Sequence, residues 1–160
     1  MLAAKNDNSC VIQISPLYDL DENEQQSTSG KTLLAGDIGK AAERRLVERF
    51  GKALDSDLLL VPHHGSSSSS SLQFLHNVSP RVGLVSAGFN NRYNHPSSKI
   101  QQRYARLSIP LLRTDELGAV QYIFKNGEWL GPFCHRYVRR HFWIQRHGNA
   151  PEICVGSLRF

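Results

Sequence analysis

The sequence predicts an α/β domain, and two observations carry this prediction. Strand-like and helix-like segments alternate at least three times along the chain, and the strand-like segments are apolar throughout. Continuous apolar strands are typical of a sheet that is covered on both faces. The length of 160 residues suits one domain with a sizeable core, and the apolar content of 40% argues against a disordered chain.

The first half of the chain is predicted to hold three strands and one helix. The strands are the segments "CVIQI", "TLLAG" and "DLLLV", at 10–14, 32–36 and 57–61. A polar, acidic surface loop is expected at 18–31, between the first two strands. Residues 39–50 have helical periodicity, with an apolar face and a charged face. The apolar face holds Ala42, Leu46, Val47 and Phe50, and the charged face holds Glu43, Arg44, Glu48 and Arg49.

The second half continues the alternation. Six serines at 66–71 precede a predicted helix at 71–78, and a serine hydroxyl is a good N-cap for it. Another apolar strand, "VGLVSAG", follows at 82–88, and Ser97 is the expected cap of the next helix. The segments "IPLLRTD" and "AVQYIFKNGEW" close the order, and the second turns at Asn126-Gly127. The serines are therefore interpreted as the polar start of a helix rather than as a linker.

The C-terminal segment at 131–160 is predicted to be a basic, aromatic tail or helix. No acidic residue lies between Glu128 and Glu152, and aromatic residues and histidines interleave with four arginines. These arginines are Arg136, Arg139, Arg140 and Arg146. Such a patch suits the phosphates and bases of a nucleic acid, and it equally suits a solvated basic helix.

Cysteine usage and hydropathy indicate a compartment. The three cysteines are an odd number and form no CxxC pair, so we expect reduced thiols in a cytosolic setting. No stretch reaches the ~18 consecutive apolar residues of a membrane span. The first ten residues contain too short an apolar run for a secretory signal. The chain taken alone is therefore predicted to be soluble.

Three loops begin where an apolar strand ends, and each carries polar side chains. They are "AGDIG" with Asp37, "PHHGS" with His63 and His64, and "AGFNNRYNHP" with Asn91 and His95. Loops at the carboxyl ends of neighbouring strands converge, and a carboxylate with imidazoles suits zinc, manganese or iron. The alternative is structural: Asp37 caps the following helix, and the histidines hold turns.

Four segments carry a family resemblance: "KTLLAGD", "SDLLLVPHHGS", "SPRVGLVSAGFNNRYNHP" and "LLRTDELGAV". In order and spacing they resemble the later part of a metallo-β-lactamase-fold domain, as found at the C-terminus of ComEC-type competence proteins. The resemblance covers about residues 9–124. It implies that residues 1–130 form the later half of an αββα sandwich, with a mixed sheet and helices on its outer face.

The resemblance also implies roles for individual residues. Asp37 matches the aspartate that bridges two metal ions, zinc or manganese, and the His63-His64 pair matches the segment that supplies the last histidine ligand. The spacing does not tell which histidine binds. His95 matches a residue beside the site that meets the substrate phosphate, and Asn91 and Arg92 are expected to bind substrate next to it. The implied reaction is two-metal hydrolysis of DNA during uptake, with Asp37 and His95 as the catalytic residues.

The sequence departs from the family pattern before Asp37. That stretch contains no histidine, whereas a complete site needs a His-x-His-x-Asp-His loop and one further histidine. The resemblance thus implies a chain that begins partway through the domain. Its expected partners are DNA, the missing N-terminal half and the membrane channel of a parent protein at the bacterial inner membrane, with this domain on the cytoplasmic side.

The short ligand set limits what we expect of the chain alone. One aspartate with one or two histidines is too few ligands for a closed dinuclear centre, so weak or no metal-dependent nuclease activity is expected, and the fragment is expected to hold few or no ions. Two alternatives stay open. One is another metallo-β-lactamase-fold hydrolase, acting on small esters, and the other is a nucleic-acid-binding module without enzymatic activity.

Overall fold

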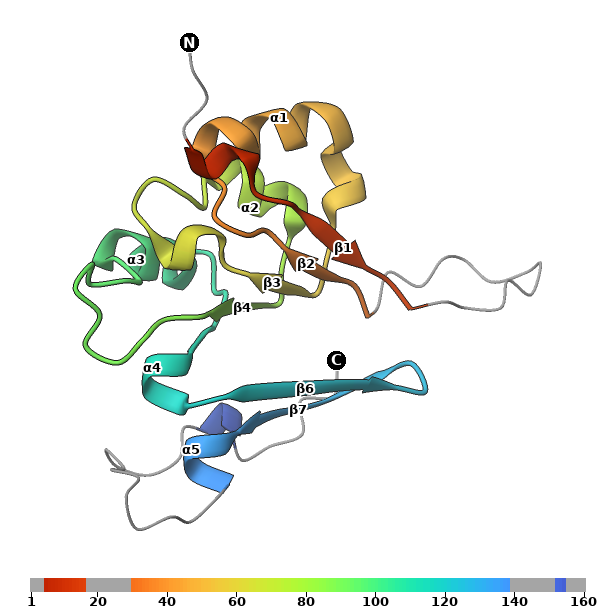
Figure 1. The fold of residues 1–160 in the computed structure, drawn as a ribbon. Coiled ribbons are helices and arrows are strands. Elements are labelled where there is room, and N and C mark those ends of the chain that lie inside the picture. Colours follow the sequence, from red (N-terminus) through yellow and green to blue (C-terminus); the bar gives the residue numbers. More distant parts are fainter. Residues whose placement is uncertain (1–4, 17–29, 139–151, 155–160) are drawn as a thin grey trace.

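A five-stranded mixed sheet forms the centre of the structure (Figure 1). The computed structural model describes residues 5–16, 30–138 and 152–154. The strands lie side by side in chain order: β1 (Ile12–Ile14), β2 (Thr32–Leu34), β3 (Leu58–Leu60), β4 (Val82–Val85) and β5 (Leu111–Arg113). β1 is antiparallel to β2, and the other neighbours are parallel. The predicted α/β class with a mixed sheet is confirmed.

Three helices cover one face of this sheet (Figure 1). They are α1 (Lys40–Phe50), α2 (Leu72–Val78) and α3 (Ser98–Arg106). Val47, Phe74 and Tyr104 from the helices are buried against strand residues such as Leu33 and Leu59. Each fully buried side chain of this size contributes about 1.5–3 kcal/mol, so this layer supplies much of the stability. The described residues also form short 3₁₀ helices: η1 (Lys5–Asn8), η2 (Gly51–Leu54), η3 (Pro62–Gly65) and η4 (Glu152–Cys154).

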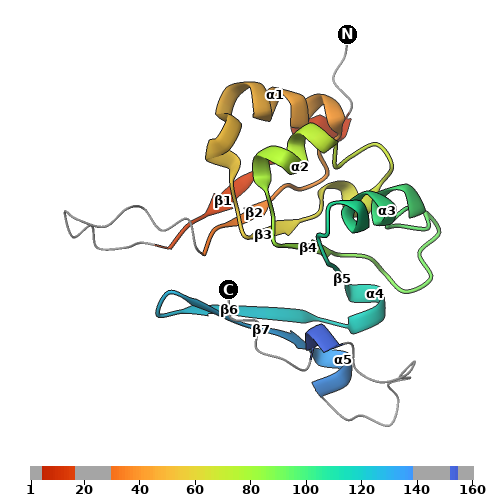
Figure 2. The same cartoon turned by 180° about the vertical axis from the view of Figure 1, so that it is seen from behind.

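A hairpin covers the other face of the sheet (Figure 2). After α4 (Thr114–Leu117) the chain forms β6 (Val120–Lys125) and β7 (Glu128–Cys134), which pair antiparallel. The turn falls at Asn126-Gly127, as predicted, and both residues have the positive φ that such a turn requires. Trp129 of the hairpin packs in one apolar cluster with Leu58, Val82 and Leu112 of the sheet. The continuous apolar strands are thus explained by cover on both faces.

The predicted charged face of α1 is wrong at one position. Glu43 has no exposed surface, whereas Phe50, which was expected to be buried, is 46% exposed. Ala42 and Val47 are buried as expected. Glu43 is buried because its carboxylate accepts hydrogen bonds from the backbone N–H groups of Ser70 and Ser71. Helical periodicity records only whether a residue is apolar, and therefore it does not report such a partner.

The prediction of three reduced cysteines is also wrong. Cys134 and Cys154 form a disulfide, and Cys10 is free and exposed. The two bonded residues lie 20 positions apart, one at the end of β7 and the other in η4. They meet because these two segments pack together in the cluster around Trp129. A count of spacings along the chain does not show such a pairing.

Two other predictions fall mostly outside the described residues. The predicted acidic loop at 18–31 is described only from Gly30 onward. Of the predicted basic segment at 131–160, the first four residues belong to β7 and the next four form α5 (His135–Val138). Arg139, Arg140 and Arg146 lie outside the described residues. Within the described part of the chain, no helix combines the length and apolar character that crossing a membrane requires.

Candidate functional site

The loops that follow β2, β3 and β4 are held together by backbone hydrogen bonds. The His63 N–H donates to the Gly36 carbonyl (2.9 Å), and the Ser97 N–H donates to the Gly65 carbonyl (3.0 Å). Gly65 has a φ of +81°, and a Cβ there would lie 2.5 Å from the Cβ of Pro96. Only glycine fits this position, so the second and third loops touch through it. The predicted meeting of these loops at one edge of the sheet is thereby seen in the backbone.

Asp37 and His64 face each other across the first two loops. Their Oδ1 and Nε2 atoms lie 3.4 Å apart, and both side chains are about half exposed, at 46% and 51%. The other ring nitrogen of His64, Nδ1, contacts the carbonyl oxygen of Ser86 at 2.8 Å. A carbonyl only accepts, so Nδ1 carries a proton and Nε2 is the atom presented to Asp37. The interpretation of Asp37 as a helix cap is wrong, because the N-cap of α1 is Gly39.

His63 uses its ring nitrogens differently. Its Nε2 lies 3.1 Å from Nδ2 of Asn6, and its Nδ1 lies 3.4 Å from Oγ of Ser68. Both contacts are to neutral groups, so the two adjacent histidines have separate environments. Both histidines have φ near +50°. This left-handed backbone conformation costs about 1 kcal/mol or more per residue. Such strain is concentrated at functional sites.

His95 completes the edge next to His63. Its ring meets that of His63 edge-on at 6.2 Å between centroids, and it stacks with Tyr93 at 5.8 Å. Its Nδ1 atom is buried and has no hydrogen-bond partner among the described residues. Burial lowers the pKa of His95, and the nearby His63 and His64 lower it further. The ring is therefore neutral at neutral pH and offers one donor and one acceptor.

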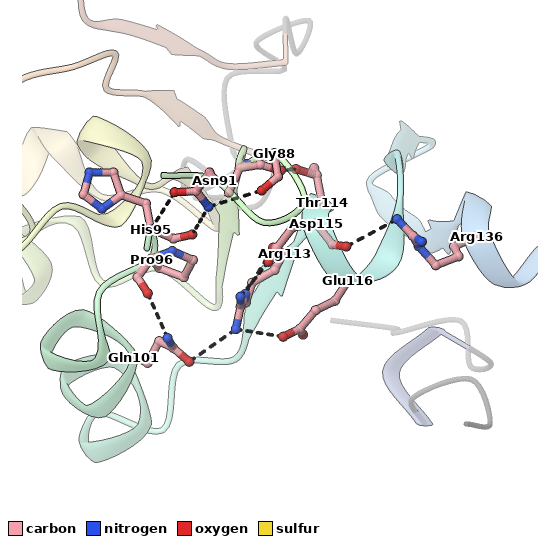
Figure 3. Close-up of polar contacts among 11 residues, drawn as sticks. Gly88, Asn91, His95, Pro96, Gln101, Arg113, Thr114, Asp115, Glu116 and Arg136 are labelled. Carbon is pink, nitrogen blue, oxygen red and sulfur yellow. Dashed lines mark hydrogen bonds and ion pairs between the residues drawn. The ribbon is translucent and has the colours of Figure 1, made fainter. Parts of the chain in front are cut away.

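Asn91 braces the loop that carries His95 (Figure 3). Its Oδ1 accepts from the His95 N–H (2.8 Å), and its Nδ2 donates to the carbonyls of His95 (2.8 Å) and Gly88 (3.2 Å). The amide is thus occupied by backbone groups. The expectation that Asn91 contacts substrate stays a prediction, but its structural part is to position His95. The guanidinium of Arg92 lies over the Tyr93 ring, 4.7 Å from its centroid.

A pocket of about 260 Å³ lies beside His95, and Arg113 is one of its walls. Nε and Nη2 of Arg113 donate to the two carboxylate oxygens of Asp115, at 3.2 and 2.6 Å. Nη1 pairs with Glu116 at 2.7 Å (Figure 3). The charge of Arg113 is therefore balanced by two carboxylates. Arg136 donates to the Asp115 carbonyl oxygen at 3.3 Å, and its predicted phosphate contact stays a prediction.

The serine segment is fixed to α1 by Glu43, a residue that the sequence reasoning placed in solvent. The Glu43 carboxylate accepts from the N–H groups of Ser70 and Ser71, the second at 2.7 Å. Burial raises the pKa of Glu43 above its ordinary value, although these hydrogen bonds act in the opposite direction. Oγ of Ser71 accepts from the Phe74 N–H at 3.3 Å, so the predicted serine cap is confirmed. No signal in the sequence indicated that Glu43, which follows Ala42 of the apolar face, would be buried and would bind the serine segment.

The donor atoms at this edge suit a divalent cation in kind. Asp37 offers oxygen and His64 offers nitrogen, which are ligands for zinc and manganese, and the Ser86 carbonyl orients the imidazole as metal-binding histidines are usually oriented. These two side chains are too few ligands for a stable metal centre. Among the described residues, no group of three or more His, Cys, Asp or Glu side chains is placed to hold a metal ion. A stable centre needs further ligands from elsewhere.

Comparisons with known proteins give relatives of this chain. No family model matches it. It is 37% identical over 125 residues to ComE operon protein 3 of Bacillus subtilis, covering 78% of the chain and 14% of that protein. It is 43% identical over 90 residues to Competence protein ComA of Neisseria gonorrhoeae, covering 56% of the chain and 13% of that protein. It is 32% identical over 121 residues to Recombination protein 2 of Haemophilus influenzae, covering 76% of the chain and 14% of that protein.

The chain spans about one-seventh of the length of the curated relatives it matches. It is therefore homologous to one segment of these competence and recombination proteins. The resemblance to ComEC-type competence proteins that the motifs predicted is supported by this identity in sequence.

Proposed function

We propose that this chain is a segment of a metal-dependent phosphodiesterase domain that acts on DNA during competence. The names of the relatives support the process, since one is Competence protein ComA, one is ComE operon protein 3 and one is Recombination protein 2. The fold we propose is the later half of an αββα sandwich, which a mixed sheet with helices on one face supports. The parent protein is proposed to lie at the bacterial inner membrane, with this domain on the cytoplasmic side.

One observation carries the metal site. The Nδ1–H of His64 is directed to the Ser86 carbonyl, so a neutral His64 presents the lone pair of Nε2 to the Asp37 carboxylate at 3.4 Å. Two acceptors that face each other repel unless a proton or a cation lies between them. Both groups are half exposed, so a cation reaches them from solvent. We therefore assign Asp37 and His64, rather than His63, as the metal-binding pair of this chain.

The residues around the pair have distinct parts in phosphodiester hydrolysis. A bound divalent ion supplies Lewis-acid polarisation of the phosphoryl oxygen and a hydroxide nucleophile at neutral pH. Asp37 and His64 would hold that ion, and further ligands would be needed to complete its coordination. His95 stays neutral because burial lowers its pKa, and its ring contributes a hydrogen bond to a phosphate oxygen. Asn91 fixes the backbone of His95 and so its direction.

Metal uptake at equilibrium tests the proposal. The 160-residue chain is dialysed against millimolar Mn²⁺ or Zn²⁺, and the excess ion over the outer buffer is counted by elemental analysis. The Asp37→Ala and His64→Ala variants are compared with His63→Ala, a matched control at the neighbouring position. We expect about one ion per chain, reduced severalfold in the first two variants and unchanged in the control.

Two results would contradict the assignment. Equal uptake by the wild-type chain and by Asp37→Ala would place the ion elsewhere. A loss in His63→Ala with none in His64→Ala would exchange the roles of the two histidines. Metal uptake at the proposed pair, followed by cleavage of a labelled DNA strand only when metal is present, supports the reaction itself.

A further inference from the structure

The loop between β4 and α3 exposes two large aromatic side chains beside the candidate site. Phe89 is 73% exposed and Tyr93 is 62% exposed, and no other large hydrophobic side chain of the described residues is exposed as much. Removing apolar surface of this size from water is favourable, so two such rings on one short loop indicate a binding surface. They lie on the loop that carries His95, the residue that we assign to the substrate phosphate.

Planar groups on this loop stack in pairs that share Tyr93. Tyr93 stacks on His95 with an angle of 23° between the ring planes, and the Arg92 guanidinium lies over Tyr93 at 4.7 Å. Nucleic-acid bases stack on both aromatic rings and guanidinium planes. A base that stacks on Arg92, Tyr93 or Phe89 would lie on the same loop as His95. The stacking surface and the phosphate-facing residue are thus adjacent.

The loop is held in place before any ligand arrives. Asn91 bonds to the backbone of His95 and Gly88, and the Asn94 N–H donates to the Asn91 carbonyl at 3.0 Å. At the start of the loop, Oγ1 of Thr114 bonds to both the N–H (2.9 Å) and the carbonyl (2.8 Å) of Ala87. A preorganised surface does not lose further conformational entropy on binding, which favours affinity.

The charges near this loop favour base contacts over contacts to phosphates. Arg92 is exposed, but the charge of Arg113 is balanced by Asp115 and Glu116, and Asp37 adds a negative charge at the same edge. Duplex DNA presents mainly phosphates and keeps its base faces covered by neighbouring pairs, whereas an unpaired strand offers those faces. We infer that the loop at 88–95 binds unpaired bases of a single-stranded nucleic acid, with Phe89 and the Arg92–Tyr93 pair as its stacking surfaces.

This inference rests on the proposed function, because it names the form of DNA that the same site takes. The chain contains a matched control for it. Arg49 lies over Phe50 at 5.3 Å, and Phe50 is 46% exposed. This second arginine–aromatic pair stands at the last residues of α1, on the far side of the helix layer from α3 (Figure 1). It has the same chemistry without the neighbouring histidine.

Binding of labelled oligonucleotides in EDTA tests the inference without metal. Fluorescence anisotropy compares a 20-nucleotide thymidine strand with a duplex of the same length, for the wild-type chain, Phe89→Ala, Tyr93→Ala and Phe50→Ala. We expect the first two variants to weaken single-strand binding about tenfold, since each removes one stacked base contact, and to change duplex binding less than about twofold. Phe50→Ala is expected to bind the single strand as the wild-type chain does. Phe89→Trp keeps an aromatic ring at this position and is expected to retain the binding that Phe89→Ala loses.

The inference is overturned if the wild-type chain does not bind the single strand, if both loop variants bind it unchanged, or if Phe50→Ala weakens it equally. Circular dichroism of each variant verifies that the fold is kept. Failure here is separable from failure of the proposed function. Metal uptake that depends on Asp37, together with unchanged strand binding by the loop variants, retains the metal site and rejects the stacking loop.

Discussion

An aspartate lies at each end of the parallel strands of the central sheet, and the surroundings of these two aspartates differ. Asp57, just before β3, has a side chain that is 8% exposed and pairs with Arg81 at 3.2 Å. The same carboxylate accepts from the N–H groups of Gly30 (2.5 Å) and Lys31 (3.1 Å). Asp37, at the carboxyl edge, has a side chain that is 46% exposed and faces His64. One carboxylate is enclosed by fixed donors, and the other is half exposed and faces a single imidazole nitrogen.

This difference distinguishes an aspartate that stabilises the fold from one that is a candidate for binding a ligand. Asp57 joins the start of β2 to β3 and to the segment before β4, so its partners are backbone groups and a cation that the fold itself supplies. Asp37 is half exposed, and the contact described for its carboxylate is the single one with His64. A polar group whose partners are all supplied by the fold is structural, and a polar group placed beside another acceptor at the ends of parallel strands is a functional candidate.

The largest expected effect is at the structural edge. Asp57→Ala leaves two backbone N–H groups without their acceptor and removes one partner of Arg81, so we expect a loss of about 3 kcal/mol in the free energy of unfolding. Urea denaturation measures this loss. An unchanged midpoint would show that the carboxylate is not part of the architecture.

A smaller loss is expected on α1. Glu43→Ala removes the acceptor of the Ser70 and Ser71 N–H groups, which should cost about 2 kcal/mol of stability. Glu48→Ala is the matched control on the same helix, since Glu48 forms an exposed pair with Arg44, and we expect a change under about 0.5 kcal/mol. Equal effects of the two substitutions in urea denaturation would contradict the bracing role of Glu43.

The pKa of Glu43 predicts a pH dependence with a definite sign. Burial raises this pKa above 4.5 in the folded chain, so the folded state holds the proton more tightly than the unfolded state. The stabilisation from Glu43 is full below pH 4.5 and is lost as pH rises through the raised pKa. Urea midpoints measured upward from pH 4.5 should therefore fall in the wild-type chain relative to Glu43→Gln. A constant difference across this range would contradict the raised pKa.

The smallest effect on stability is expected at the functional edge. Asp37→Ala removes a half-exposed carboxylate with one long side-chain contact, so the free energy of unfolding should change by less than about 0.5 kcal/mol. The same denaturation experiment as for Asp57→Ala measures it. A loss as large as that of Asp57→Ala would mean that Asp37, too, belongs to the architecture.

The sequence predicted the parts of the fold that depend on local patterning. The apolar runs at 32–36, 57–61 and 82–88 became adjacent parallel strands, and Asp37, His64 and His95 follow them at one edge as expected. Local patterning predicts these features because parallel strands with short polar loops direct those loops to the same side. The serine cap of α2 was predicted on similar grounds, since capping depends on neighbouring residues alone.

Features that depend on distant partners were not predicted. Glu43 is buried because of N–H groups 27 and 28 positions later, and Cys134 meets Cys154 only through the packing of β7 against η4. The sequence also left His63 and His64 equivalent. Contacts with Asn6 and with the Ser86 carbonyl distinguish them, and both contacts come from other segments of the chain.

The comparison of the two edges is tested most directly by locating a bound paramagnetic ion. Mn²⁺ broadens the NMR signals of nearby nuclei even when it binds weakly, so it reports a site with few protein ligands. We predict that substoichiometric Mn²⁺ selectively broadens the backbone amide signals around Asp37 and His64, that Asp37→Asn abolishes this broadening, and that Asp57→Asn retains it. Broadening centred elsewhere, or equally present in Asp37→Asn, would contradict the assignment of the carboxyl edge as the functional one.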